Sequence, residues 1–205
     1  MKNLTLGLLL VLFVGATNAF AEPVTITFSE LTPRVAHGVS IAGVTFGFSI
    51  NGAASADATY NNTDAGNTQY IRGSALEGNA SGALTLNFTQ ATSLLSFGVA
   101  LSSFNTLSPG FTVRLFDASL NAIGTFNVTT ISTLSFTEGF FQYAGAPVAR
   151  AVITFNAALA GGRFALDNLT VNAIPEPATL LLLGSGLAAI ASLARRRKQT
   201  NKERI

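Results

Sequence analysis

Between Glu22 and Ala173 the apolar residues recur at every second position, in short runs that glycine, asparagine, serine and proline separate. Val24, Ile26 and Phe28, for example, alternate with Thr and Ser. This is the period of a β-strand, whose successive side chains point to opposite faces. No run of ten residues here has the 3.6-residue period of a helix. The pattern predicts an all-β region of about nine or ten short strands, arranged as an antiparallel β-sandwich or jelly roll.

Two connections between the expected strands can be placed from the sequence. Residues 51–81 are polar and rich in Gly, Ala and Asn, so we expect a long surface loop there. The segment from Ala118 to Asn121 separates the alternating runs "GFTVRLF" and "IGTFNV". That arrangement predicts a hairpin turn between two neighbouring strands.

The last alternating run changes phase in its middle. In "RFALDNLTV" the residues Phe164 and Leu166 share one face, whereas Leu169 and Val171 have the opposite parity. An extra residue in a strand shifts the alternation by one position and so keeps the apolar side chains on one face. The sequence therefore predicts a β-bulge at Asp167 and Asn168.

The N-terminus has the form of a secretory signal peptide. Lys2 precedes an apolar run from Leu4 to Val14, and Ala19 and Ala21 supply the small residues of a cleavage site. We expect a signal peptide over residues 1–21, removed after Ala21, with the Sec translocon and signal peptidase as partners. The alternative is an uncleaved membrane anchor, for which the apolar run is short.

A second apolar segment lies near the C-terminus. Residues 178–194 carry no charge, and as a helix they span about 25 Å, close to the hydrocarbon core of a bilayer. The basic residues that follow, Arg195, Arg196, Arg197 and Lys198, predict a cytoplasmic stop signal. We therefore expect a transmembrane helix at 178–194, a cytoplasmic tail at 199–205 and residues 22–173 as an ectodomain outside the membrane.

The charges are distributed unevenly along the chain. The ectodomain has five Arg, no Lys and eight acidic residues, a net charge of −3, whereas the last eleven residues carry a net charge of +5. A nucleic-acid-binding domain carries Lys and Arg on its folded face. This ectodomain does not, so we expect no nucleic-acid partner.

The tripeptide Pro175-Glu176-Pro177 directly precedes the second apolar segment. Together, the tripeptide, the Leu/Gly/Ala-rich helix and the Arg cluster over residues 174–198 resemble the PEP-CTERM sorting signal of Gram-negative bacteria. The same region is also labelled an ice-binding protein C-terminal domain, a label that implies no ice activity. The resemblance implies that exosortase, a membrane protease, recognises the tripeptide, and that the protein is associated with exopolysaccharide or biofilm. The alternative is an ordinary single-span anchor.

Few residues in the ectodomain are suited to catalysis. The chain has one histidine, His37, and no cysteine, and it contains no Gly-x-Ser-x-Gly elbow, no zinc-ligand cluster and no phosphate-binding loop. We place His37 in an exposed loop. The sequence is therefore interpreted as that of a non-enzyme.

Three stretches of the ectodomain, "ITFSELTP…GVTFGF", "LFDASLNAIGTF" and "GGRFALDNLTV", look like extracellular PEP-CTERM proteins with a jelly-roll domain. Related jelly-roll carbohydrate-binding modules often hold a structural calcium ion between their first and last strands. That resemblance implies Glu30 and Asp167 as calcium ligands, and we expect no other cofactor. The alternative is that Asp167 accepts hydrogen bonds from backbone amides at the bulge, or pairs with an arginine.

Aromatic side chains suggest where a sugar would bind. The chain has no Trp, and Tyr60 and Tyr70 flank the polar stretch "NNTDAGNTQ". We consider them as a sugar-contacting rim, against the alternative of a solvated loop with incidental tyrosines.

These observations predict an exported bacterial protein, first anchored in the inner membrane and then located at the cell surface or in the extracellular matrix. Its expected role is association with exopolysaccharide, with carbohydrate binding by the ectodomain. Two alternatives are a purely structural matrix or adhesion protein and, less favoured, a polysaccharide-active hydrolase.

Overall fold

The computed structural model describes residues 22–63, 68–133, 135–158 and 161–172, together with Gly186. These residues form a single antiparallel sheet of twelve strands. The strands are β1 (Pro23–Ile26), β2 (Arg34–Val35), β3 (Ser40–Ile41), β4 (Val44–Ile50), β5 (Ala53–Ala54), β6 (Thr59–Asn62), β7 (Ala75–Asn79), β8 (Gly82–Leu101), β9 (Leu107–Phe116), β10 (Ala122–Ser132), β11 (Thr137–Phe155) and β12 (Arg163–Asn172).

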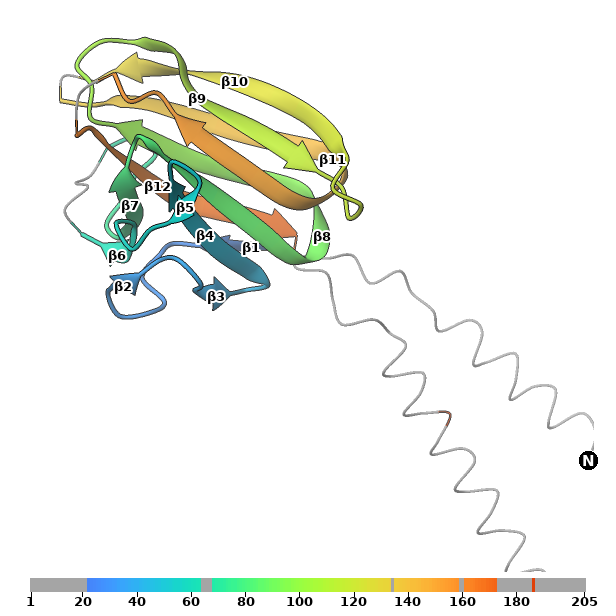
Figure 1. Ribbon diagram of the computed structural model, residues 1–205. Helices are drawn as coiled ribbons and strands as arrows, with labels where there is room; N and C mark the ends of the chain where they lie inside the picture. The colour runs from blue at the N-terminus through green and yellow to red at the C-terminus, as the bar shows by residue number, and fades with distance from the viewer. Residues whose placement is uncertain (1–21, 64–67, 134, 159–160, 173–185, 187–205) are drawn as a thin grey trace, which may run out of the picture. The chain divides into compact units, whose positions relative to one another are not determined.

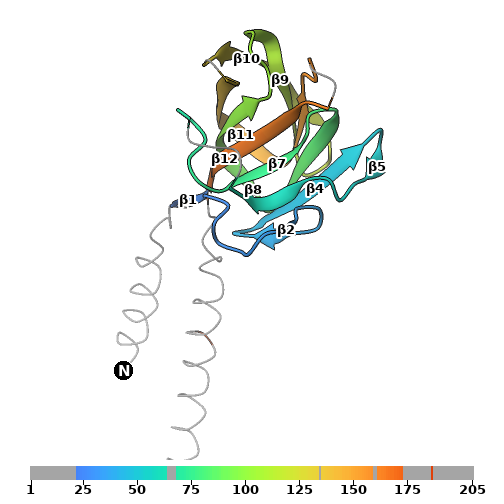
Figure 2. The ribbon, with the colours of Figure 1, turned by 90° about the vertical axis from the view of Figure 1, so that its left-hand side faces the viewer.

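Two long strands, β8 and β11, organise the sheet and run side by side through the molecule (Figure 1). The first part of β8 also pairs with β4, and its last part pairs with β12. The end of β11 pairs with β9 on the edge that does not face β8, and β9 in turn pairs with β10. The paired strands β8 and β11 are thus shared by both parts of the sheet, and the strands on either side of them enclose one core (Figures 1 and 2). This confirms the predicted all-β, antiparallel β-sandwich class.

The apolar pattern of β8 explains how one strand serves both parts of the sandwich. Leu84 and Leu86 are buried at even positions, whereas Leu95 and Phe97 are buried at odd positions. The parity changes between residues 88 and 95, where the pairing with β11 also shifts register. Both halves of the strand therefore present their apolar side chains to the same core.

Aromatic rings fill much of that core. Phe155 at the end of β11 stacks on Phe164 of β12, with ring centroids 3.8 Å apart, and Phe48 of β4 contacts the same ring. Each fully buried Phe contributes about 1.5–3 kcal/mol by the removal of its surface from water. These contacts join strands that do not pair with one another, so they hold the two parts of the sandwich together.

The structure confirms two local predictions. Residues 117–121 form the turn between β9 and β10, where the carboxylate of Asp117 accepts hydrogen bonds from the backbone N–H groups of Ser119 and Asn121. The register of β12 against β8 shifts between Asp167 and Thr170, which is the predicted bulge.

The prediction of a long loop over residues 51–81 was wrong. The strands β5, β6 and β7 lie in this range, and β6 and β7 extend the sheet from β12. Gly78 in β7 is required by packing, because a Cβ atom at this position would lie 2.9 Å from the ring of Phe164. Tertiary contacts, rather than strand propensity, define this part of the sheet.

The first and last strands pair with each other, so that Pro23 lies opposite Asn172. The backbone N–H of Asn172 also donates a 3.0 Å hydrogen bond to the hydroxyl of Thr92. No helix in the described ranges is both long enough and apolar enough to cross a membrane. The helix predicted at 178–194 lies outside those ranges, apart from Gly186.

Candidate functional site: a groove on the outer face of the sheet

The strands β11, β8, β12 and β7 are neighbours in that order, and the candidate site lies on their outer face, away from the core. The register places Glu138, Ala100, Ala165 and Glu77 in one line across these four strands. Adjacent residues such as Leu101 point into the core. Two small side chains therefore lie between two acidic ones on the outer face.

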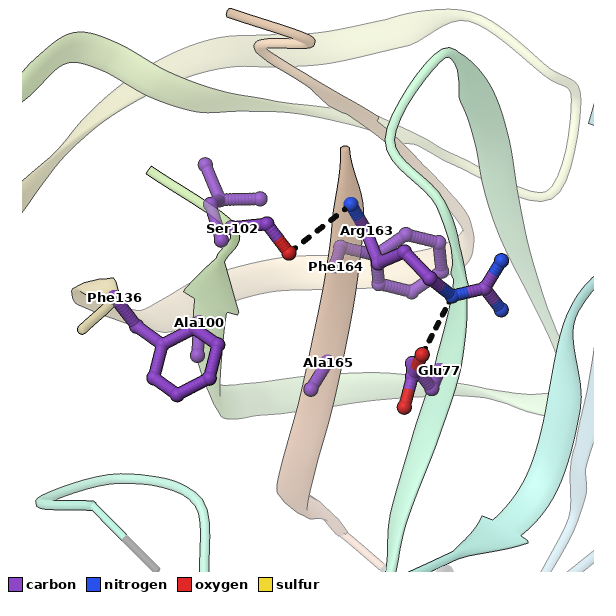
Figure 3. A pocket seen from close by; sticks show the side chains of 8 residues that line it. Glu77, Ala100, Ser102, Phe136, Arg163, Phe164 and Ala165 are labelled. Atoms are coloured by element: carbon purple, nitrogen blue, oxygen red, sulfur yellow. Dashed lines mark hydrogen bonds and ion pairs between the residues drawn. The ribbon is translucent and has the colours of Figure 1, made fainter. Parts of the chain in front are cut away.

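A groove of about 150 Å³ lies at this line of residues (Figure 3). Phe136 lies on one side of Ala100 and Ala165, and Arg163 and Glu77 lie on the other (Figure 3). The groove is therefore apolar at its floor and on one wall, and charged on the opposite wall. The complete lining consists of Glu77, Ala100, Leu101, Ser102, Phe136, Arg163, Phe164 and Ala165.

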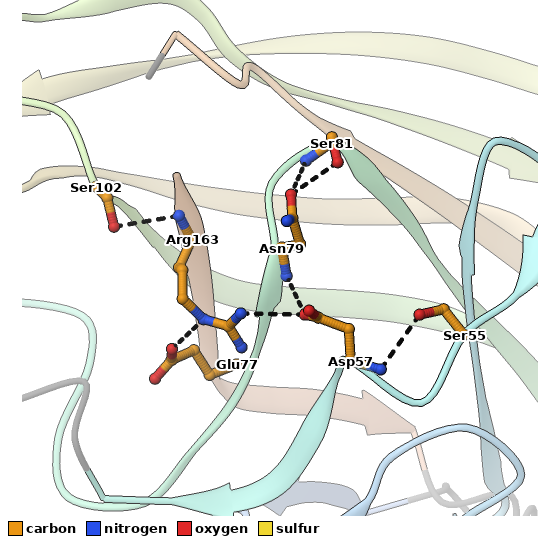
Figure 4. Close-up of polar contacts among 7 residues, drawn as sticks. All are labelled: Ser55, Asp57, Glu77, Asn79, Ser81, Ser102 and Arg163. Atoms are coloured by element: carbon orange, nitrogen blue, oxygen red, sulfur yellow. Dashed lines mark hydrogen bonds and ion pairs between the residues drawn. The ribbon is translucent and has the colours of Figure 1, made fainter. Parts of the chain in front are cut away.

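Arg163 is held in place by three acceptors (Figure 4). Its Nε atom donates a 2.5 Å hydrogen bond to Glu77 Oε1, and its Nη1 atom donates one of 3.1 Å to Asp57 Oδ1. Its backbone N–H donates to the Ser102 hydroxyl at 3.2 Å. Asp57 is fixed in turn, because its Oδ1 atom accepts a 2.8 Å hydrogen bond from the backbone of Asn79. The charged wall is therefore ordered before any ligand arrives.

Glu138, at the other end of the line, fixes the segment Thr68–Arg72 (the 68–72 segment). Its side chain is 4% exposed, and it accepts hydrogen bonds from the hydroxyl of Thr68 and from the backbone N–H groups of Gln69 and Tyr70, at 3.1 and 3.2 Å. Ile71 in the same segment is buried in a small cluster with Ala100 and two other alanines. A buried carboxylate needs such donors, so Glu138 has a structural role under this segment.

Asp167 binds the same segment from β12. It is 1% exposed, its Oδ2 atom accepts a 2.8 Å hydrogen bond from the Arg72 N–H, and its Oδ1 atom accepts one of 2.6 Å from the Asn168 N–H. Burial raises the pKa of Asp167, although these two N–H groups act in the opposite direction. The sequence-based alternative, in which Asp167 accepts hydrogen bonds from backbone amides at the bulge, is confirmed.

Glu30 has a different set of partners. Its carboxylate accepts 2.7 Å hydrogen bonds from the Tyr60 hydroxyl and from the backbone N–H of Thr27. Partial burial pushes the pKa of Glu30 upward, but these donors outweigh that effect and hold the pKa below its usual value. Among the described residues there is no group of three or more His, Asp or Glu side chains that could hold a metal. Calcium binding by Glu30 and Asp167 stays a prediction.

The structure separates the two tyrosines that the sequence grouped together. Tyr60 is fully buried, with its ring in contact with those of Phe28 and Phe46, so its placement on an exposed binding rim was wrong. Burial, together with its hydrogen bond to Glu30, raises the pKa of Tyr60. Tyr70 is partly buried and stacks on the exposed ring of Phe140, with centroids 5.4 Å apart.

The single histidine is exposed, and its Nδ1 atom accepts a 3.0 Å hydrogen bond from the Phe48 N–H. The other predicted functional residues lie outside the described ranges. These are the cleavage residues Ala19 and Ala21, the motif residues Pro175, Glu176 and Pro177, and the basic residues Arg195, Arg196, Arg197 and Lys198.

Sequence reasoning missed the residues that line the groove. Arg163 has the same parity as Ala165 and Asp167, which could have placed it on the outer face of β12. No signal in the sequence pairs it with Glu77, because that contact joins strands separated by more than eighty residues.

Residues 173–198 match the family model described as the PEP-CTERM protein-sorting motif. The resemblance stated from residues 174–198 is thus confirmed, and the chain carries a PEP-CTERM sorting segment. Such a segment indicates an exported, surface-directed protein and implies exosortase as the processing partner. No curated protein sequence matches the chain.

Among solved structures, similarity is found to carbohydrate-binding modules of family 29. One such module aligns at 13% identity over 78% of this chain and 97% of its own length, with a TM-score of 0.40. A variant module complexed with mannohexaose aligns at 16% identity over 75% and 92% of the two chains, also with a TM-score of 0.40. Similarity at this level does not bear on what this chain binds.

Proposed function

We propose that this chain is an exported protein that exosortase processes at its C-terminal segment, and that its β-sandwich then associates with exopolysaccharide at the cell surface or in the extracellular matrix. The match of residues 173–198 to the sorting motif carries this proposal. In this scheme the Sec translocon exports the chain and signal peptidase removes residues 1–21. The segment 178–194 holds the precursor in the inner membrane, and Arg195 to Lys198 keep its end cytoplasmic.

The position of the motif supports processing close to the folded region. Asn172 is the last residue of β12, and only Ala173 and Ile174 separate it from Pro175. Proline fixes φ and cannot donate a backbone hydrogen bond, and it restricts the residue before it. Pro175-Glu176-Pro177 is therefore suited to an extended conformation in a protease cleft.

The groove favours a binding role over a catalytic one. Glycosidases commonly use two carboxylic acids that flank the scissile bond. Among the groove-lining residues, Glu77 is the single carboxylic acid, and Arg163 already engages one of its oxygens. We therefore propose that the ectodomain binds polysaccharide without cleaving it.

The sorting proposal is tested by the mass of the native extracellular protein. We expect a chain that begins at Glu22 and ends near Pro175-Glu176-Pro177. The variant Glu176→Ala should leave a longer, membrane-retained chain, whereas Glu203→Gln, which lies beyond the matched segment, should be processed normally. An extracellular chain that still carries Arg195 to Lys198, or a mass unchanged by deletion of exosortase, would refute the proposal.

A further inference from the structure

We infer that the groove between Phe136 and the Arg163–Glu77 pair binds one uncharged sugar residue of a polysaccharide. This inference rests on the proposed association with exopolysaccharide, and it assigns that association to a site and to a class of ligand. The groove offers an apolar surface, a set of polar groups and a local charge, and each of these restricts the ligand.

The apolar surface fits the face of a pyranose ring. Ala100 and Ala165 line the base of the groove but are only 4% and 7% exposed, because they pack against Ile71, so Phe136, which borders them on one side, supplies the accessible apolar surface (Figure 3). A pyranose has C–H groups on its ring faces and hydroxyl groups at its edge. Pockets for small ligands likewise combine apolar walls with a few placed polar groups. The sugar ring would therefore pack its C–H face against Phe136.

The opposite wall supplies partners for the hydroxyl groups. Ser102 accepts a hydrogen bond from Arg163, which leaves its own O–H available as a donor. Glu77 uses Oε1 to bind Arg163, and within the described ranges its Oε2 atom has no hydrogen-bond donor. The Nη2 group of Arg163 likewise has no acceptor among the residues that the structure describes. The groove lining thus includes one carboxylate acceptor and two kinds of donor.

These polar groups are already positioned for binding. Glu77 and Asp57 hold the guanidinium of Arg163 at two different nitrogens (Figure 4). The floor consists of the adjacent hydrogen-bonded strands β8 and β12. Little ordering entropy is therefore lost when a ligand enters, which favours binding of a weakly held sugar residue.

Charge selects against acidic sugars. Arg163 is paired with two acidic residues, Glu77 in the groove lining and Asp57 outside it, so these three side chains together carry a net charge of −1, and the ectodomain as a whole carries −3. A uronate carboxylate would meet the accepting oxygen of Glu77 and be repelled. The groove volume of about 150 Å³ lies below the range of about 300–1,000 Å³ that is usual for larger ligands. The site is thus suited to a single neutral ring.

Affinity electrophoresis of the purified full-length chain in detergent tests this inference independently of sorting. The probes are three neutral polymers, dextran, hydroxyethylcellulose and galactomannan, and the uronate polymer alginate. We expect retardation by at least one neutral polymer and none by alginate. Phe136→Ala should weaken that binding about tenfold, whereas Phe136→Tyr, which keeps the ring, and Phe104→Ala, at an exposed phenylalanine outside the groove, should change it less than about twofold.

A second variant tests the role of charge. Glu77→Gln keeps the shape of the wall and removes its extra negative charge, so discrimination against alginate should decrease. Circular dichroism confirms that each variant is folded. If a neutral polymer binds wild type and Phe136→Ala equally, the groove assignment is refuted while polysaccharide association stands. If no neutral polymer binds, or if alginate binds best, the inference fails, and the mass measurement still decides the sorting proposal.

Discussion

The hydroxyl of Tyr60 donates a 2.7 Å hydrogen bond to the carboxylate of Glu30. The tyrosine is fully buried, whereas the glutamate reaches the surface, so the bond joins the aromatic core to the turn that follows β1. The sequence suggested a sugar contact for one residue and a metal ligand for the other. Their direct contact gives both a role in holding the chain after its first strand.

Removing this hydroxyl should weaken the fold and change the acidity of its partner. We expect Tyr60→Phe to lower the free energy of unfolding by about 1 kcal/mol, because one hydrogen bond is lost while Glu30 remains accessible to water. The pKa of Glu30 should rise, since the Tyr60 hydroxyl is a main cause of its depression. Urea denaturation and NMR titration of the Glu30 carboxyl carbon measure the two effects. An unchanged Glu30 pKa would contradict this account.

Glu30 should also make stability depend on pH. Its pKa in the folded chain lies below the usual value, so its stabilisation is fully present above the ordinary pKa of glutamate and is lost as the pH falls through the depressed value. The free-energy difference between wild type and Glu30→Gln should therefore shrink as the pH falls through this window. Denaturant titrations at successive pH values provide the test, and a difference that grows on acidification would reverse the sign of the argument.

Glu138 should determine the local stability of the 68–72 segment. Glu138→Gln replaces one accepting oxygen with an NH₂ group, so at least one of the donors at Thr68, Gln69 and Tyr70 loses its acceptor. An unpaired buried polar group costs about 1–3 kcal/mol. We expect faster hydrogen exchange at the Gln69 and Tyr70 amides, with exchange in the β4–β8 pairing unchanged. Equal acceleration in both regions would instead indicate global destabilisation.

Gly98 should be sensitive to the smallest substitution. A Cβ atom at this position would lie 2.5 Å from the Cβ of Tyr70 and 2.9 Å from its carbonyl oxygen, whereas one at Gly47 would lie 3.5 Å from its nearest neighbour. We expect Gly98→Ala to lower the free energy of unfolding by about 1–3 kcal/mol through overpacking, and Gly47→Ala to change it by less than about 1 kcal/mol. Equal effects of the two variants in thermal denaturation would exclude close packing of Tyr70 as the cause.

Local patterns in the sequence predicted those features that depend on neighbouring residues. The parity of Phe164 and Leu166 against Leu169 and Val171 located the bulge at Asp167, because alternation is fixed within one strand. The turn at Ala118 to Asn121 followed from its position between two alternating runs.

The features that the sequence did not predict depend on contacts between distant residues. Tyr60 was assigned to a loop because its neighbours are polar, and only its packing on Phe28 and Phe46 buries it. The groove likewise requires the lateral order of four strands, which alternation within each strand does not encode. The fold class could be predicted from periodicity, whereas the site required the register between strands.

The pairing of Pro23 with Asn172 has a mechanical consequence. Because both ends of the folded region lie at the same end of one antiparallel pair, tension applied between them would peel β1 from β12 one residue pair at a time. If the sandwich were instead held at some other point and pulled through its C-terminal end, the force would act on β12. That strand is flanked by β8 along most of its length. Loss of the N-terminal connection would therefore shift an applied force from a strand pair that unzips to a strand embedded in the sheet.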